Sequence, residues 1–249
     1  LALIIMEYGL NETNFLGLYG AGSIFRCHHY NELTFSMIYA YSENFVLVFS
    51  HDEGFTEKGS LVNKMPGQTF EDKFANLRAA YGFMMGHPGK KLLFMGQDFG
   101  QFHEWDEKSP SLDLTKEPFH ADLQNYVKGL LTLYHKYPAL YRLDEEYDAS
   151  IGINANDGDR SIFSFIRRDE TQKKNLLFIC NFTPVDRDDY RVGVPKRGTY
   201  TLLLDQEHGY YKRGDKISHY RSIKSECDGR PYSFAYPLPA YGTAVFRFS

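Results

Sequence analysis

Residues 43–50 read ENFVLVFS and residues 91–96 read KLLFMG, two short and continuous apolar runs. Runs of this kind are typical of strands that are buried on both faces, as in parallel sheets. Between them, Thr69-Phe70-Glu71-Asp72 resembles a capping box, and Gly86-His87-Pro88-Gly89 is a stop signal, which together predict a helix. Apolar residues within it recur every three or four positions, at Phe70, Phe74, Leu77, Tyr81 and Met84. The order strand, helix, strand predicts a βαβ unit with a parallel pair.

The pattern changes near Asp144. Before this point, a second helix is predicted that ends at Pro138. Its shared face comprises Leu123, Tyr126, Val127, Leu130, Leu131 and Tyr134. After this point, short β-prone runs are separated by turn signals such as residues 156–159 and Asp228-Gly229. The runs cover residues 161–166, 175–181, 198–204, 232–236 and 243–248. Their spacing predicts an antiparallel β-sandwich.

Composition excludes several functional classes. The 249 residues are 43% hydrophobic, with 28 basic and 32 acidic side chains spread along the chain, so neither a nucleic acid nor a membrane partner is expected. The apolar run at residues 1–6 is too short to span a bilayer. Cys27, Cys180 and Cys227 lie far apart, which indicates neither a disulfide framework nor a zinc site. A reducing cytoplasm is the expected location.

Polar side chains follow both predicted parallel strands. His51, Asp52 and Glu53 come directly after the first strand, and Gln97, Asp98 and Gln101 come after the second. Ligands of parallel α/β proteins bind at the carboxyl ends of the strands, so both groups are expected to face one pocket. A carboxylate and an imidazole there can stabilise positive charge on a sugar ring. The position of His51, Asp52 and Glu53 after a strand would also fit a charged, solvent-exposed turn with no role in binding.

Several motifs together resemble one family. They are Tyr41 to Leu47, Ser50 to Glu53, Lys64 to Gly67, Lys73 to Arg78 with Tyr81-Gly82, Pro88 to Gly96, Glu104-Trp105, Ser111 to Asp113, Arg167-Arg168 and Asn181 to Pro184. In order and spacing they are similar to the glycogen (1,4-α-glucan) branching enzymes of the α-amylase superfamily. The resemblance covers roughly Tyr30 to Ser249.

The resemblance implies a fold. Residues 1–143 would contain the last two βα units of a (β/α)8 barrel, with residues 1–27 unplaced, and residues 144–249 would form the C-terminal antiparallel β-sandwich. The expected class is therefore α/β plus all-β. Two βα units cannot close a barrel, because eight are needed, so the chain looks truncated at its N-terminus.

The resemblance also implies a reaction. Branching enzymes cleave an α-1,4-glucan by a retaining mechanism and transfer the chain to a 6-hydroxyl, and they need no cofactor or metal. Asp52 would stabilise the transition state and His51 would assist it. The nucleophile and the proton donor belong to earlier barrel strands, which this chain lacks. The chain alone is therefore expected to be inactive. Substrate contacts are expected from Glu53, Gln97, Asp98, Gln101 and Trp105.

Alternatives stay open at this stage. Gln97, Asp98 and Gln101 suit loop capping as well as glucan contact, and Trp105 suits core packing as well as sugar stacking. His28, His29 and His103 lack metal-ligand spacing and are interpreted as ordinary histidines. Arg167-Arg168 and Tyr210-Tyr211 could contact glucan, although structural roles are favoured.

Two other functions remain possible. The chain could come from another hydrolase or transferase of the superfamily, which shares Asp52 and His51, or it could be a non-catalytic glucan-binding remnant. The segments Asn181 to Pro184 and Lys64 to Gly67 favour a branching enzyme. The sequence does not predict an oligomeric state.

Overall fold

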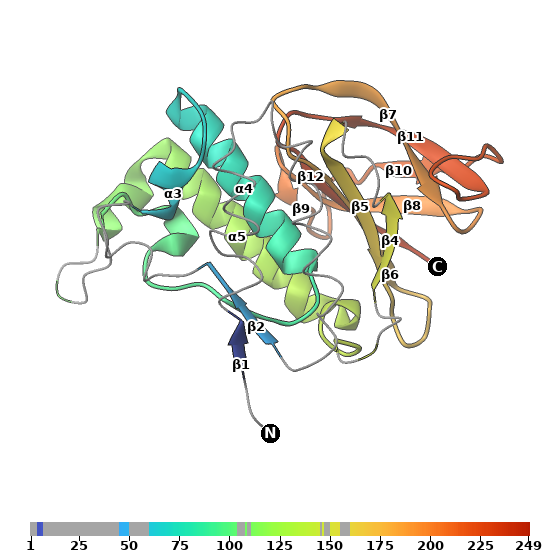
Figure 1. Cartoon of the computed structure of the whole chain (residues 1–249), viewed down its shortest axis with the longest axis horizontal. Coiled ribbons are helices and arrows are strands. Elements are labelled where there is room, and N and C mark those ends of the chain that lie inside the picture. Colours follow the sequence, from blue (N-terminus) through green and yellow to red (C-terminus); the bar gives the residue numbers. More distant parts are fainter. Residues whose placement is uncertain are drawn as a thin grey trace.

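The computed structural model describes residues 4–6, 45–49, 60–103, 108, 111–144, 146, 150–154 and 160–249. Figure 1 shows a helical part that lies beside a larger β part, with a small group of strands next to the helices. Within the described residues, no helix is long and apolar enough to cross a membrane.

The small sheet is parallel. Strand β2 (Phe45–Val48) pairs with β3 (Lys90–Leu92), and α4 (Phe70–Gly86) connects them. The predicted βαβ unit is therefore confirmed. Strand β3 ends at Leu92, before the end of the predicted 91–96 run, and the chain then turns at Gly96, whose φ of 79° lies in the left-handed region.

A third parallel strand was not predicted. β1 (Ile4–Met6) pairs with the other edge of β2, with Ile5 opposite Val46. Residues 1–27 were left unplaced from the sequence, and the expected two parallel strands are in fact three. A strand of three residues is too short for its period to be recognised in the sequence.

The helices follow their sequence signals closely. Thr69 caps α4, since its hydroxyl accepts the amide hydrogen of Asp72 at 3.1 Å while the Asp72 carboxylate accepts that of Thr69 at 3.4 Å. α5 runs over Pro118–Lys136, with proline in its first turn, and the chain leaves it through Tyr137. The short helical turns are α3 (Leu61–Lys64), η3 (Gln97–Phe99), η4 (Leu112–Lys116) and η5 (Pro138–Leu140).

The β part is antiparallel throughout, as predicted. Its larger sheet has the order β10-β8-β12-β6-β5-β4, with β9 attached to β8, and its smaller sheet pairs β11 with β7. The strands are β4 (Ser150–Asn154), β5 (Ile162–Arg167), β6 (Asn175–Asn181), β7 (Arg187–Val194), β8 (Thr199–Asp205), β9 (Gly209–Tyr210), β10 (His219–Arg221), β11 (Tyr232–Leu238) and β12 (Thr243–Phe248). The predicted turn at Asp228-Gly229 is confirmed, with φ values of 52° and 66°, whereas residues 156–159 lie outside the described residues.

The larger sheet is buried on both faces. Phe165 and Phe178 point into the core shared with α4 and α5, whereas Ile166 and Leu177 point into the core shared with β7 and β11. The result is a three-layer arrangement of helices, sheet and sheet (Figure 1). Double burial explains why β5 and β6 read as continuous apolar runs instead of alternating.

Two glycines let α4 approach the larger sheet closely. A Cβ atom at Gly86 would lie 2.6 Å from Cζ of Phe165, and one at Gly82 would lie 2.6 Å from Oγ1 of Thr243. Real Cβ atoms do not come this close to other atoms, so the close packing of α4 on the larger sheet requires glycine at both positions. One hydrophobic core therefore continues across the expected boundary at residue 144.

Candidate active site

The carboxyl ends of β2 and β3 lie side by side, where the sequence predicts the site. Phe49, the residue after β2, is fully buried. His51, Asp52 and Glu53 come after Ser50, and they lie outside the described residues, as does Trp105. The roles assigned to these four residues stay predictions.

Gln97 connects the two strand ends. Its side-chain Nε2 donates to the carbonyl oxygen of Phe49 at 2.9 Å, and its Oε1 accepts the amide hydrogen of Phe94 at 2.8 Å. Tyr81 of α4 donates its hydroxyl to the carbonyl oxygen of Gln97 at 2.7 Å. Burial, with a smaller contribution from the charge of Asp98, raises the pKa of Tyr81, so this hydroxyl keeps its proton. Gln97 therefore fixes the backbone just before His51.

The other two predicted side chains also bond within the protein. Asp98 accepts a hydrogen bond from Nε2 of Gln124 on α5 at 3.1 Å. Gln101 is buried and donates to the carbonyl oxygen of His103 at 3.2 Å. Both contacts hold the loop at residues 96–101 in place. Glucan contact by Gln97, Asp98 and Gln101 stays a prediction, while their structural role is visible.

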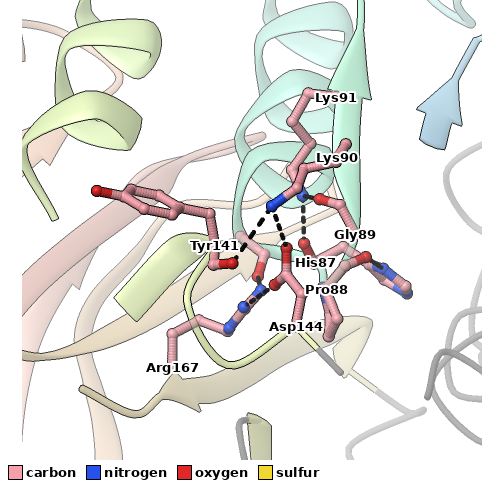
Figure 2. Close-up of polar contacts among 9 residues, drawn as sticks. His87, Pro88, Gly89, Lys90, Lys91, Tyr141, Asp144 and Arg167 are labelled. Atoms are coloured by element: carbon pink, nitrogen blue, oxygen red, sulfur yellow. Dashed lines mark hydrogen bonds and ion pairs between the residues drawn. The ribbon is translucent and has the colours of Figure 1, made fainter. Parts of the chain in front are cut away.

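A second polar cluster occupies the opposite end of β3 (Figure 2). Lys91 donates to the carbonyl oxygens of His87 and Gly89. Its pKa is lowered well below the usual value, mainly by burial. Because this end of the strand is the amino end, the cluster lies away from the ends where ligands of parallel sheets bind. Its role is to hold the turn between α4 and β3.

Arg167 belongs to the same cluster. Its side chain is fully buried, and its guanidinium contacts Asp144 Oδ1 at 2.5 Å and the carbonyl oxygen of Gly86 at 2.8 Å. Figure 2 shows Asp144 between Arg167 and Lys90, whose Nζ lies 3.7 Å from Oδ2 of Asp144. Of the two roles considered for Arg167, the structural one is confirmed. An arginine at the end of a fully buried strand indicates that an acidic partner is needed, but the sequence does not identify which residue it is.

Within residues 60–103 and the other described segments, no group of three His, Cys, Asp or Glu side chains could hold a metal ion. Cys180 is a buried free thiol, and burial raises its pKa to about 12, so it is not a nucleophile.

A family model and solved structures resemble parts of this chain. Residues 153–249 match the family described as alpha amylase, C-terminal all-beta domain. The fold is similar to that of pullulanase type I from Bacillus subtilis in complex with maltose, with a TM-score of 0.64 and 14% identity over 93% of this chain and 32% of that chain. It is also similar to the alpha-amylase from H. orenii, with a TM-score of 0.55 and 16% identity over 94% of this chain and 46% of that chain. Residues 153–249 therefore belong to this family of all-β domains, and the fold of the whole chain resembles that of these two enzymes.

Sequence relatives have a much higher identity to this chain. The 1,4-alpha-glucan branching enzyme GlgB of Butyrivibrio fibrisolvens is 47% identical over 223 residues, which cover 87% of this chain and 34% of that protein. The enzyme of the same name from Aquifex aeolicus is 43% identical over 242 residues, which cover 92% of this chain and 36% of that protein. The chain is thus related to the C-terminal portion of the 1,4-alpha-glucan branching enzymes, and it spans about a third of their length.

Loss of the Gln97 contacts should slow catalysis. In an enzyme that contains this segment and a complete barrel, we expect Gln97→Met to lower kcat by about tenfold with little change in KM, because the backbone at Phe49 loses a hydrogen bond that fixes it. The matched control is Gln124→Met, which removes a hydrogen bond from the same loop without touching Phe49. An unchanged kcat for Gln97→Met alongside a lower Tm would leave Gln97 with a purely structural role.

His87 should make stability depend on pH. Burial lowers its pKa to about 3, partly opposed by the Pro88 carbonyl and by Asp144, and reinforced by Lys91 and Arg167. Below pH 6.5 the unfolded chain therefore binds a proton at this residue that the folded chain excludes until about pH 3. Stability should fall on acidification through this window, by up to about 1.4 kcal/mol per pH unit.

Denaturant titrations between pH 7 and 4 measure this dependence. His87→Gln should flatten the slope, whereas His135→Gln, a substitution of an exposed histidine on α5, should leave it unchanged. Equal slopes for the native chain and His87→Gln would contradict the assignment.

Proposed function

We propose that this chain is the C-terminal portion of a 1,4-α-glucan branching enzyme, an enzyme that transfers a cleaved α-1,4-glucan chain to a 6-hydroxyl. The observation that carries the proposal is the 47% identity to such an enzyme over 87% of the chain. Solved structures with 14–16% identity support the fold and leave the reaction open. In this proposal, β1, β2 and β3 are the last strands of a (β/α)8 barrel.

Asp52 and His51 are the proposed catalytic contribution of the segment. Branching enzymes react with retention, so an enzyme carboxylate attacks the anomeric carbon and a second carboxyl group protonates the departing oxygen. Positive charge builds on the sugar ring meanwhile, and Asp52 stabilises it while His51 holds a sugar hydroxyl. Gln97 supports this arrangement from the neighbouring loop, because it fixes the backbone at Phe49.

The substrate is an α-glucan, and the chemistry requires no cofactor. Glu53, Asp98, Gln101 and Trp105 are proposed to contact the glucan chain near the reacting sugar. Neither nucleic acid nor membrane is a proposed partner, and a cytoplasmic location stays a prediction.

A pair of assays tests the proposal. An enzyme that contains this segment and a complete barrel is incubated with linear amylose, and iodine staining and reducing ends are followed together. Transfer should weaken the iodine colour while the number of reducing ends stays nearly constant, since each cleaved end is used again. A parallel rise in reducing ends would identify a hydrolase of the superfamily instead.

A further inference from the structure

Two neighbouring hollows open where the helices meet the β part. The helix-side hollow, between α4, α5 and the turn at residues 206–210, has a volume of about 1070 Å³. The sheet-side hollow, lined by residues of β7, β8, β10 and β11, has a volume of about 410 Å³. Gln206, Glu207 and Pro239 line both hollows, so the two adjoin, and together they are called the groove.

The sheet-side hollow is aromatic and acidic. Its rings are Tyr211, Tyr220 and Tyr236, and its carboxylates are Asp186, Asp188, Asp205 and Glu207. Among the residues that the structure describes, no Lys, Arg or His lines it. Such a surface repels phosphates and other anions. It suits a sugar, whose C–H face packs on a ring while its hydroxyls donate to carboxylates.

The helix-side hollow mixes charges of both signs. Arg78 and Lys128 line it together with Glu71 and Asp122. Burial lowers the pKa of Arg78, and the charges of Asp122 and Glu71 partly oppose this shift. The wall therefore offers both hydrogen-bond donors and acceptors, which suits a neutral ligand rich in hydroxyl groups. A cationic ligand would suit only the sheet-side hollow, because in the helix-side hollow it would meet the positive charges of Arg78 and Lys128.

The junction between the hollows is held rigidly. Oδ1 of Asp205 accepts the amide hydrogens of Glu207 at 3.1 Å and His208 at 2.7 Å, and Oδ2 accepts the Tyr211 hydroxyl at 2.6 Å. The rings of His208 and Tyr211 stack with centroids 4.2 Å apart. A ligand that binds here meets a preorganised surface, which lowers the entropic cost of binding.

One polar atom at this junction lacks a partner. Oε1 of Gln206 is buried and accepts no hydrogen bond within the part of the chain that the structure describes. A buried acceptor without a donor is unfavourable, and a ligand hydroxyl supplies the missing donor if the amide turns toward the groove.

We propose that this groove binds a stretch of linear α-glucan. The lining indicates a neutral ligand rich in hydroxyl groups, and the joined hollows indicate an elongated one. The choice of glucan among such ligands rests on the function proposed above. In this role the groove holds a chain without taking part in bond cleavage.

Binding of maltoheptaose to the full chain of residues 1–249 tests the proposal. In amide-resolved NMR titrations, shifts are expected at residues 205–211 and along α5 at residues 122–129. Asp188→Ala combined with Glu207→Ala should weaken the Kd by about tenfold, because two charged acceptors are lost. Both side chains are exposed, so the fold should remain intact. The matched control is Asp189→Ala, an exposed neighbour outside the groove, which should bind like the native chain.

Unchanged affinity in the double variant, or shifts confined to residues outside the groove, would overturn the proposal. The groove and the function proposed for the enzyme can fail separately. Maltoheptaose bound in the groove without branching by the intact enzyme would refute the function and the reason for choosing glucan, while branching without groove binding would refute the groove alone.

Discussion

Asp144→Ala is expected to lower the free energy of unfolding by about 3–5 kcal/mol, because it leaves a buried charge without its counterion. The Arg167 side chain has no exposed surface, and the Asp144 side chain is 9% exposed. Burial keeps solvent from replacing the lost carboxylate, and the Gly86 carbonyl alone cannot neutralise the guanidinium. Chemical denaturation of the full chain measures the effect.

Two further variants make this test specific. Arg142→Ala breaks an ion pair with Glu170 whose side chains are 60% and 48% exposed, and it should change stability by less than about 1 kcal/mol. Combining Asp144→Leu with Arg167→Met removes both charges and should recover much of the loss. A double variant as unstable as Asp144→Ala would show that packing, and not the uncompensated charge, determines the effect.

Asp52→Asn should reduce kcat by roughly a hundredfold or more in an enzyme that contains this segment and a complete barrel. Positive charge develops on the sugar ring chiefly in the transition state, so a preorganised carboxylate contributes more there than in the ground state. The amide keeps the shape and some hydrogen bonds to hydroxyls, so KM should change little. Steady-state rates of branch formation on amylose measure both constants.

The comparison with Gln97→Met separates the two roles assigned to this region. Asp52→Asn should cost more in kcat than Gln97→Met, since the contact that the structure shows for Gln97 acts through the backbone at Phe49. If Asp52→Asn kept a normal kcat and only KM rose, Asp52 would be a substrate-binding residue and the transition-state role would be withdrawn.

Local signals predicted much of the fold. The capping pair Thr69 and Asp72 marks the start of α4 at the correct residue, and the runs at residues 175–181 and 243–248 match β6 and β12. These features depend on residues that are close together in the sequence, so they can be predicted from the sequence directly.

Strand β7 was missed for a physical reason. Its buried residues Tyr190, Val192 and Val194 alternate, as in a half-buried strand, but Asp188 and Asp189 interrupt the apolar pattern at its start. Strand β4 was missed because it is short and contains Gly152, a residue that is unfavourable in strands.

The contacts of the candidate site could not be predicted from the sequence. The hydrogen bond from Gln97 to Phe49 joins residues 48 positions apart, and the ion pair of Arg167 with Asp144 joins residues 23 apart. The groove is built from α4, α5 and the turn before β9, which only the folded chain brings together. Residue types identified polar candidates at the strand ends, whereas their partners depend on tertiary structure.

The most direct test of the proposed function is a count of α-1,6 linkages. Linear amylose is incubated with an enzyme that contains this segment and a complete barrel, and the anomeric signals of α-1,4 and α-1,6 linkages are integrated by proton NMR. The proposal predicts that α-1,6 linkages appear as α-1,4 linkages disappear in equal number, and that Asp52→Asn slows both changes together. Loss of α-1,4 linkages without any gain of α-1,6 linkages would contradict it.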